Sequence, residues 1–297
     1  MAESCGFIAV LGASNVGKST LINTIVGAKV SIVSPKVQTT RARVMGIALH
    51  ETAQIVFIDT PGIFTPKRRL DRAMIAAAWT GAADADRIMV VVDAARGNDS
   101  DTRDIVKKLR KTERKALLVL NKIDIVAKEK LLILTEELNA SEVFTDIFML
   151  SALNGDGVQD LVTFLANCVP VGPWMFPEDQ ISDMPQRLLA AEITREQLFL
   201  QLHQELPYAT TVETETWENK DDGTVKINQV IYVERDSQKS IILGKSGTKI
   251  KSIGAAARVE LGEMLDCKVH LFLFVKVREK WGDDPERYRD WGLDFKS

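Results

Sequence analysis

The sequence has few cysteines, no long apolar run and no excess of positive charge. Cys5, Cys168 and Cys267 are far apart and lack a CxxC spacing, which argues against a disulfide framework or a zinc site. Apolar runs such as residues 88–92 and 271–275 have strand length, whereas a membrane span needs about 20 apolar residues. The first six residues also lack the segments of a secretory signal. We therefore expect a soluble, cytoplasmic protein, whose surface could still dock on a membrane.

The charge balance restricts the way in which the chain could bind a nucleic acid. Its 38 basic and 41 acidic residues give a formal net charge of −3. Total charge therefore does not steer the protein to RNA, and any RNA site requires a local cluster of basic residues. The length of 297 residues and the hydrophobic content of 45% suit about two globular domains.

Residues 1–170 alternate short apolar runs with amphipathic stretches. The predicted strands are residues 7–11, 55–58, 88–92, 116–120 and 144–150. The predicted helices include residues 18–26, 102–111 and 157–166. This alternation predicts an α/β domain with a doubly wound, mainly parallel sheet.

The remaining residues predict a linker and an α+β domain. Residues 171–183 are rich in proline and glycine and are predicted to form the linker. The sequence of residues 184–297 predicts a long helix closed by Pro207 and then a hairpin of two strands. A glycine loop that follows a strand comes next, and a helix, a last strand and a polar tail complete the chain. The hairpin strands are residues 209–217 and 225–233, with a turn at residues 221–223.

A phosphate-binding motif follows the first predicted strand. It fits GxxxxGK[ST] and consists of Gly12, Ala13, Ser14, Asn15, Val16, Gly17, Lys18 and Ser19, with Thr20 next in the chain. Its backbone N–H groups are expected to surround phosphate oxygens, with Lys18 at the β- and γ-phosphates and Ser19 on Mg²⁺. An ordinary glycine turn is the alternative, but the strand before the motif and the helix after it favour nucleotide binding.

Two further segments are predicted to meet the γ-phosphate and the metal. Asp59 ends a strand and is expected to hold Mg²⁺ through water, while the Gly62 N–H approaches the γ-phosphate. Thr40 lies in a polar loop and is the candidate to complete the Mg²⁺ shell, with Thr39 as the alternative. Ile63 occupies the place where Ras-like enzymes carry a water-orienting glutamine. We therefore expect slow intrinsic GTP hydrolysis, with Lys18, Thr40 and Gly62 as the catalytic residues.

The guanine-specific residues are predicted at the ends of two later strands. The first group, in an NKxD motif, is Asn121, Lys122 and Asp124, and the second is Ser151, Ala152 and Leu153. The Asp124 carboxylate can accept hydrogen bonds from guanine N1–H and the 2-amino group, which adenine cannot offer. Lys122 would lie along the base, and Asn121 is expected to bond to the phosphate loop. A backbone N–H of residues 151–153 could contact the guanine carbonyl.

These motifs together resemble the Era family of bacterial ribosome-assembly GTPases over essentially the whole chain. The resemblance includes residues 15–21, 38–41, 59–62 and 121–124 and the hydrophobic Ile63. It implies a P-loop GTPase domain and, through Asn15, a potassium ion that replaces an arginine finger. Ala13-Ser14 departs from the Arg-Pro common in the family, at positions that supply backbone. The first domain alone also fits tRNA-modifying or other ribosome-assembly GTPases.

The second half supplies the local basic cluster. Its candidate RNA-binding residues are Gly244, Lys245, Ser246, Gly247, Lys249 and Lys251. A GxxG loop of this kind clamps four nucleotides in KH domains, although many GxxG segments are plain turns. Residues 237–259 contain no acid, which favours RNA binding.

The resemblance implies a type II KH domain that binds the 3′ end of 16S rRNA during assembly of the 30S subunit, and contact with the inner membrane surface. Trp281, Tyr288 and Trp291 are either stacking aromatics or tail residues packed on the domain. The alternatives are an RNA-binding protein with a purely structural nucleotide site and a membrane-associated signalling GTPase. We expect a monomer that exchanges GTP and GDP.

Overall fold

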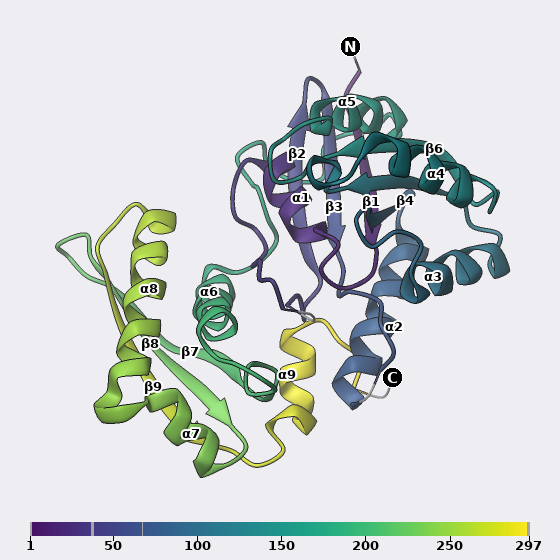
Figure 1. Cartoon of the computed structure of the whole chain (residues 1–297). Coiled ribbons are helices and arrows are strands. Elements are labelled where there is room, and N and C mark those ends of the chain that lie inside the picture. Colours follow the sequence, from purple (N-terminus) through teal and green to yellow (C-terminus); the bar gives the residue numbers. More distant parts are fainter. Residues whose placement is uncertain (1, 37–38, 67, 296–297) are drawn as a thin grey trace. The chain divides into compact units, whose positions relative to one another are not determined.

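The computed structural model describes residues 2–36, 39–66 and 68–295 (Figure 1). The chain divides into two compact units. Unit 1 contains the described parts of residues 1–33, 40–183 and 288–297, and unit 2 those of residues 34–39 and 184–287. The predicted domain boundaries at 170 and 184 stay a prediction, and this partition differs from them in placing residues 34–39 with the second half and 288–297 with the first.

Unit 1 is built on a six-stranded sheet with the order β2-β3-β1-β4-β5-β6. Every neighbouring pair is parallel except β2 with β3, so the mainly parallel sheet is confirmed. The strands are β1 (Ser4–Leu11), β2 (Val44–His50), β3 (Ala53–Asp59), β4 (Arg87–Asp93), β5 (Ala116–Asn121) and β6 (Phe144–Leu150).

Helices cover both faces of this sheet, as Figure 1 shows. They are α1 (Lys18–Val26), α2 (Arg69–Asp84), α3 (Ser100–Lys111), α4 (Lys128–Asn139) and α5 (Val158–Cys168). Successive side chains of a strand point to opposite faces, so both faces of a central strand are buried. In β1, Ile8 and Val10 belong to the core beneath α1 and α5, whereas Ala9 and Leu11 belong to the core beneath α2, α3 and α4.

The edge strand β2 was not predicted from the sequence. It pairs antiparallel with β3 along its whole length, from Val44 opposite Asp59 to His50 opposite Ala53. Glu51 and Thr52 form the turn between the strands, and Glu51 takes a positive φ of 52° without being glycine or asparagine. The usual hairpin signal is therefore missing.

Backbone and side-chain hydrogen bonds hold the segment 171–183 against the sheet of unit 1. Ile47 N–H donates to Ile181 O at 2.9 Å. The fully buried Gln54 accepts from the N–H groups of Met175 and Phe176 at 2.9 and 3.0 Å and donates to Phe176 O at 2.8 Å. This proline-containing segment thus follows the edge of the sheet through specific bonds.

Unit 2 has a three-stranded sheet in the order β7-β8-β9. Its elements are α6 (Gln186–Gln201), β7 (Thr211–Asn219), β8 (Val225–Val233), α7 (Asp236–Leu243), α8 (Thr248–Leu265) and β9 (Val269–Val277). Strand β8 pairs antiparallel with β7 and parallel with β9. The predicted α+β class is confirmed, with the hairpin turn at residues 220–224 closed by Lys220 N–H donating to Thr224 O at 2.8 Å.

Two predictions for this half were wrong. The long helix was predicted over residues 184–205, but it spans Gln186–Gln201, because Leu202 is extended and Gln204 adopts a positive φ. The glycine loop does not follow a strand, because α7 intervenes. This helix begins where Gln238 Oε1 accepts from the N–H groups of Glu234 and Arg235 at 2.8 and 3.1 Å.

The aromatic residues near the C-terminus are buried. Trp281 is 3% exposed and its indole N–H donates to Ala209 O at 3.1 Å. Tyr288 is fully buried, and its ring packs against those of Trp291 and Phe295. Helix α9 (Pro285–Asp290) carries Tyr288. Trp281 therefore packs on the second half of the chain, as one of the two sequence interpretations has it, whereas Tyr288 and Trp291 belong to the residues that cluster with unit 1.

Candidate nucleotide and RNA sites

The phosphate-binding loop connects β1 to α1 and has a backbone that excludes side chains at two points. Gly12 has a φ of 155°, and a Cβ there would lie 2.4 Å from Val91 O. Gly17 has a φ of 96°, and a Cβ there would lie 2.3 Å from Asn121 Nδ2. Both positions require glycine because of the conformation and the close neighbour. The loop is thereby fixed between strands β4 and β5.

Lys18 is the first residue of α1, and its side chain turns back over the loop. Its Nζ donates to Gly12 O at 3.1 Å and to Ala13 O at 2.9 Å. Burial lowers the pKa of Lys18 to about 8, and the negative charge of Asp59 opposes this shift. A phosphate at the loop would supply the negative charge that this buried ammonium group lacks. Thr20 lies two residues further along α1 and is half-buried.

Asp59, at the end of β3, lies among three hydroxyl groups. Its Oδ2 accepts hydrogen bonds from Ser19 Oγ and Ser31 Oγ, both at 2.7 Å, and Thr40 Oγ1 lies 3.1 Å from Ser19 Oγ. Asp59 is fully buried, and burial raises the pKa of its carboxyl group above the usual value. Among the described residues, its Oδ1 has no hydrogen-bond partner.

The two candidate threonines of the loop face different surroundings. Thr40 Oγ1 lies beside Ser19, whereas Thr39 Oγ1 donates to Lys36 O at 2.9 Å and lies 2.9 Å from Ser34 Oγ. The geometry therefore favours Thr40 for the metal shell. Gln38 lies outside the described residues.

Gly62 lies against the phosphate-binding loop. A Cβ at this position would lie 2.7 Å from Ser14 Oγ and 2.9 Å from Ser14 Cα, so the close approach of the two segments requires glycine. The next residue continues the contact, because Ile63 N–H donates to Gly12 O at 3.0 Å. The Ile63 side chain is buried and offers no group that could orient water.

Asn121, at the end of β5, joins three segments of the site. Its Nδ2 donates to Val16 O at 2.8 Å, which confirms the expected bond to the phosphate-binding loop. Its Oδ1 accepts from the N–H groups of Lys122 and Ala152 at 2.8 and 2.9 Å. A single buried amide thus fixes the phosphate-binding loop relative to the two segments that the sequence predicts to contact guanine.

The rest of the NKxD motif lies around this amide. Lys122 Nζ donates to Asn15 O at 2.8 Å and to Asp93 Oδ2 at 2.6 Å, which ties it to the end of β4. Asn15 itself has a positive φ of 63° and is half-buried. Asp124 is exposed in a short 3₁₀ turn, with its carboxylate accessible to a base.

The segment after β6 is held by its own backbone groups. Ser151 is buried and its N–H donates to Asp156 O at 2.9 Å. Ala152 uses its N–H for Asn121, and its carbonyl oxygen accepts from Thr24 Oγ1 at 2.7 Å. Leu153 is 79% exposed at the tip.

Sequence reasoning missed Ser31 and Asn23, which support the cluster of hydroxyl groups around Asp59. Asn23 Oδ1 accepts from the N–H groups of Val30 and Ser31, both at 3.0 Å, and its Nδ2 donates to Ser31 O at 2.7 Å. These bonds hold the loop after α1 so that Ser31 reaches Asp59. No local motif marks the contact between Ser31 and Asp59, because these two residues lie 28 positions apart in the sequence.

The GxxG loop lies between α7 and α8. Gly244 has a φ of 69°, and a Cβ there would lie 2.7 Å from Lys249 Cβ. Gly247 has a φ of 77°, and no described atom lies within 4 Å of the position of a Cβ. The second glycine is therefore open to an approaching phosphate, whereas the first one is needed for packing of the loop on α8.

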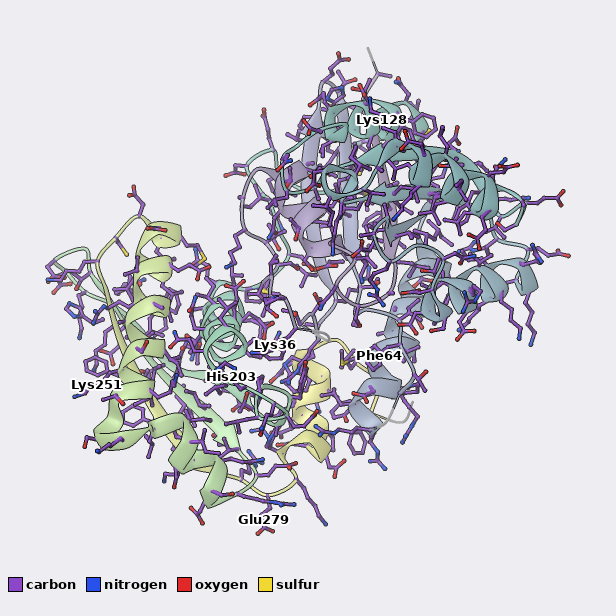
Figure 2. All side chains as sticks on the ribbon, in the orientation of Figure 1. Lys36, Phe64, Lys128, His203, Lys251 and Glu279 are labelled. Carbon is purple, nitrogen blue, oxygen red and sulfur yellow. The ribbon has the colours of Figure 1, made fainter. Side chains whose placement is uncertain are left out.

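The basic residues near this loop differ in accessibility. Lys245, Ser246 and Lys251 are exposed, and Figure 2 labels Lys251 on α8. Lys249 is half-buried and its Nζ donates to Gln201 O at 3.4 Å, which places its charge at the C-terminal end of α6. The loop and Lys251 thus form the accessible part of the predicted RNA site.

The two sites and their folds define the class of protein, a P-loop GTPase with a KH domain in its second half. Comparison with known families gives the same division. Residues 7–122 match the family described as "50S ribosome-binding GTPase", and residues 205–282 match the KH domain family. No helix in the described ranges is long and apolar enough to cross a bilayer.

The chain belongs to the GTPase Era family. It is 62% identical over 290 residues to GTPase Era of Sinorhizobium medicae, covering 98% of this chain and 94% of the relative. A solved structure of Era in complex with MgGDPNP and nucleotides 1506–1542 of 16S ribosomal RNA matches 98% of this chain and 99% of that one, with a TM-score of 0.92 and 39% identity. A variant of Aquifex aeolicus Era bound to GDP and aluminium fluoride matches 97% of this chain and 99% of that one, with a TM-score of 0.91 and 39% identity.

Proposed function

We propose that this GTPase is a switch that binds the 3′ region of 16S rRNA and acts in assembly of the 30S subunit. The observation that carries the switch is the position of Thr40, from the polar loop after α1, beside Ser19, which in turn donates to Asp59. The RNA partner is supported by the GxxG loop and by the full-length likeness to an Era bound to 16S rRNA nucleotides.

The side chains around Asp59 fit a magnesium ion. Two hydroxyl groups and a carboxylate are the oxygen donors that Mg²⁺ prefers, and the unpartnered Asp59 Oδ1 is the kind of buried atom that an ion or its water would satisfy. Ser19 and Thr40 would hold the ion directly and Asp59 through water. When bound, the ion would neutralise charge between the β- and γ-phosphates.

The remaining residues act by positioning and by electrostatics. Lys18 would exchange its bonds to the loop carbonyls for phosphate oxygens, and the Gly62 N–H would donate to the γ-phosphate. Asp124 would accept from guanine. Since Ile63 cannot orient water, hydrolysis without an activator is proposed to be slow, and loss of the γ-phosphate would release Thr40 and Gly62.

Two finer features are part of this proposal. Asn15 would contribute to a potassium site beside the phosphates, which predicts faster hydrolysis in potassium than in sodium at equal ionic strength. The surface of the protein would make peripheral contact with the inner membrane. Flotation with vesicles of anionic lipid tests that contact, and protein that stays at the bottom of the gradient would contradict it.

The experiment that tests the switch measures GTP hydrolysis at fixed salt with an RNA of the 3′ end of 16S rRNA and with a scrambled RNA. We expect stimulation by the first RNA alone, and tighter RNA binding with a non-hydrolysable GTP analogue than with GDP. Thr40→Ala should abolish the difference in RNA affinity between the two nucleotide states. Equal RNA affinity in both states of the unaltered protein would contradict the switch, while the GTPase assignment would stand.

A further inference from the structure

The hydroxyl group of Ser14, in the phosphate-binding loop, is a polar group that the site described above does not use. Ser14 follows Gly12 and Ala13 in the loop, and its side chain is buried, with 7% of the residue exposed. Among the described residues, its Oγ has no hydrogen-bond partner. A buried hydroxyl group without a partner lowers stability, so a loop that keeps one is expected to use it for a ligand.

Two neighbouring segments fix the position of Ser14. Arg96, in the turn after β4, donates from Nη1 to Ser14 O at 2.8 Å, and its Nη2 is paired with Asp99 at 2.7 Å. Gly62 packs against the same residue, because a Cβ at Gly62 would lie 2.7 Å from Ser14 Oγ and 3.0 Å from Ser14 N. The hydroxyl group is therefore held beside the backbone of Gly62.

The groups around this hydroxyl are suited to an anion. The buried ammonium group of Lys18 lies over the same loop and bonds to the carbonyl oxygens of the two residues before Ser14. In the proposed mechanism, this ammonium group and the Gly62 N–H both bind the γ-phosphate. A phosphate oxygen is an acceptor only, and the Ser14 hydroxyl is a donor that lacks an acceptor among the described residues.

We propose that the Ser14 hydroxyl donates a hydrogen bond to an oxygen of the γ-phosphate and thereby helps the site to distinguish GTP from GDP. The bond forms with GTP alone, because GDP ends at the β-phosphate. The inference rests on the proposed position of the γ-phosphate at Gly62, and it adds a side-chain donor at a position that GxxxxGK[ST] leaves open. The departure of Ala13-Ser14 from Arg-Pro then concerns side-chain chemistry as well as backbone, since proline has no hydroxyl group.

The experiment compares the full chain with Ser14→Ala, which keeps the Cβ at this position and removes only the hydroxyl group. Calorimetry measures the affinities for GDP and for a non-hydrolysable GTP analogue in Mg²⁺, and thermal unfolding is followed without nucleotide. Thr60→Val is the matched control for stability, because it removes a hydroxyl group that is equally buried but donates to Val10 O at 2.6 Å. Ser100→Ala removes an exposed hydroxyl group of the same unit.

We expect Ser14→Ala to bind the GTP analogue about tenfold more weakly, which is the loss of one charge-assisted hydrogen bond, and to bind GDP as the unaltered chain does. Without nucleotide, its Tm should equal or exceed that of the unaltered chain, because the variant lacks a buried donor that has no acceptor. Thr60→Val should have a lower Tm, because it leaves Val10 O without this donor. Ser100→Ala should match the unaltered chain in all three measurements.

Two results would overturn the inference. Ser14→Ala would bind both nucleotides with unaltered affinity, or it would lose affinity for both by similar factors together with a lower Tm, as a residue that only packs the loop does. Gly62→Ala, measured in the same way, separates this failure from that of the proposed γ-phosphate position. If Gly62→Ala weakens the analogue more than GDP and Ser14→Ala does not, only the hydroxyl contact fails. If neither variant does so, the proposed position fails and the contact fails with it.

Discussion

The bonds of Asn121 predict that one amide supports the stability of unit 1 and nucleotide binding together. The side chain is 2% exposed and makes three hydrogen bonds, to Val16 O and from the N–H groups of Lys122 and Ala152. Asn121→Ala removes all three and leaves buried backbone groups without these partners. Val16 and Ala152 are buried, and each unsatisfied buried group costs about 1–3 kcal/mol, so we expect a decrease of roughly 2–6 kcal/mol in the free energy of unfolding.

The measurement is thermal unfolding of the nucleotide-free chain, followed by binding of fluorescent GDP. A decrease of that size corresponds to roughly 5–15 °C in the Tm of a unit of this length. The affinities for GDP and for a GTP analogue should fall by similar factors, of at least about tenfold, because Asn121 positions loops that both nucleotides use. Asn154→Ala, at an exposed position in the same unit, is the matched control.

Two results would refute this reasoning directly. If the stability of Asn121→Ala lies within about 0.5 kcal/mol of the Asn154→Ala control, the range typical of neutral surface substitutions, the three bonds do not stabilise the site. A loss of GTP binding alone, with GDP binding intact, would likewise show that the residue acts on the γ-phosphate and not on the scaffold.

Three further predictions concern the phosphate and metal region. Ser31→Ala removes one hydrogen bond to Asp59 and should raise the Mg²⁺ concentration that gives half-maximal hydrolysis about tenfold. The affinity for GDP in EDTA should not change, and an unaltered Mg²⁺ dependence of hydrolysis would contradict this prediction. Gly62→Ala places a Cβ 2.7 Å from Ser14 Oγ and should weaken a GTP analogue more than GDP in calorimetry, whereas equal losses would argue against a γ-phosphate role. Because burial lowers the pKa of Lys18 to about 8 from 10.5, GDP binding near pH 8 should take up protons, and GDP affinity should fall as pH rises further. Without nucleotide, the pKa of Lys18 is lower in the folded state than in the unfolded state. Its contribution therefore makes the free energy of unfolding rise with pH between about 8 and 10.5. Calorimetry of GDP binding near pH 8 that shows no proton uptake would refute the lowered pKa.

The nucleotide site was predictable because each of its motifs follows a strand with a strong apolar pattern. Parallel strands bring their carboxyl ends to one edge of a sheet, so Gly12, Asp59, Asn121 and Ser151 had to meet there. Helix α1 was predicted with its observed bounds, since the GK[ST] motif fixes its start and Gly27 its end. At these positions the structure that the local sequence pattern predicts is also the structure that the packed domain adopts.

The features that were missed depend on contacts that the local pattern does not encode. Strand β2 contains Gly46, whose Cβ would lie 2.6 Å from Ile22 Cγ2, so a glycine that weakens the strand pattern is required by packing of α1. Helix α7 buries only Ile242 and exposes Ile241, which hides the helical period. The partners of Asp59 were incomplete because Ser31 reaches it only through the loop that Asn23 holds.

The partition of the chain adds a physical argument to the proposed switch. Thr39 and Thr40 are consecutive, yet they belong to different compact units. Within unit 2, Thr39 O accepts from Arg195 of α6, and Lys36 Nζ donates to Phe199 O and Leu202 O at the end of the same helix. Within unit 1, Thr40 lies beside Ser19. Because one peptide bond joins the two threonines, a nucleotide that draws Thr40 toward the phosphates would pull on a segment whose other contacts are with α6. In the proposed switch GTP would exert this pull and GDP would not, because the γ-phosphate is what Thr40 responds to.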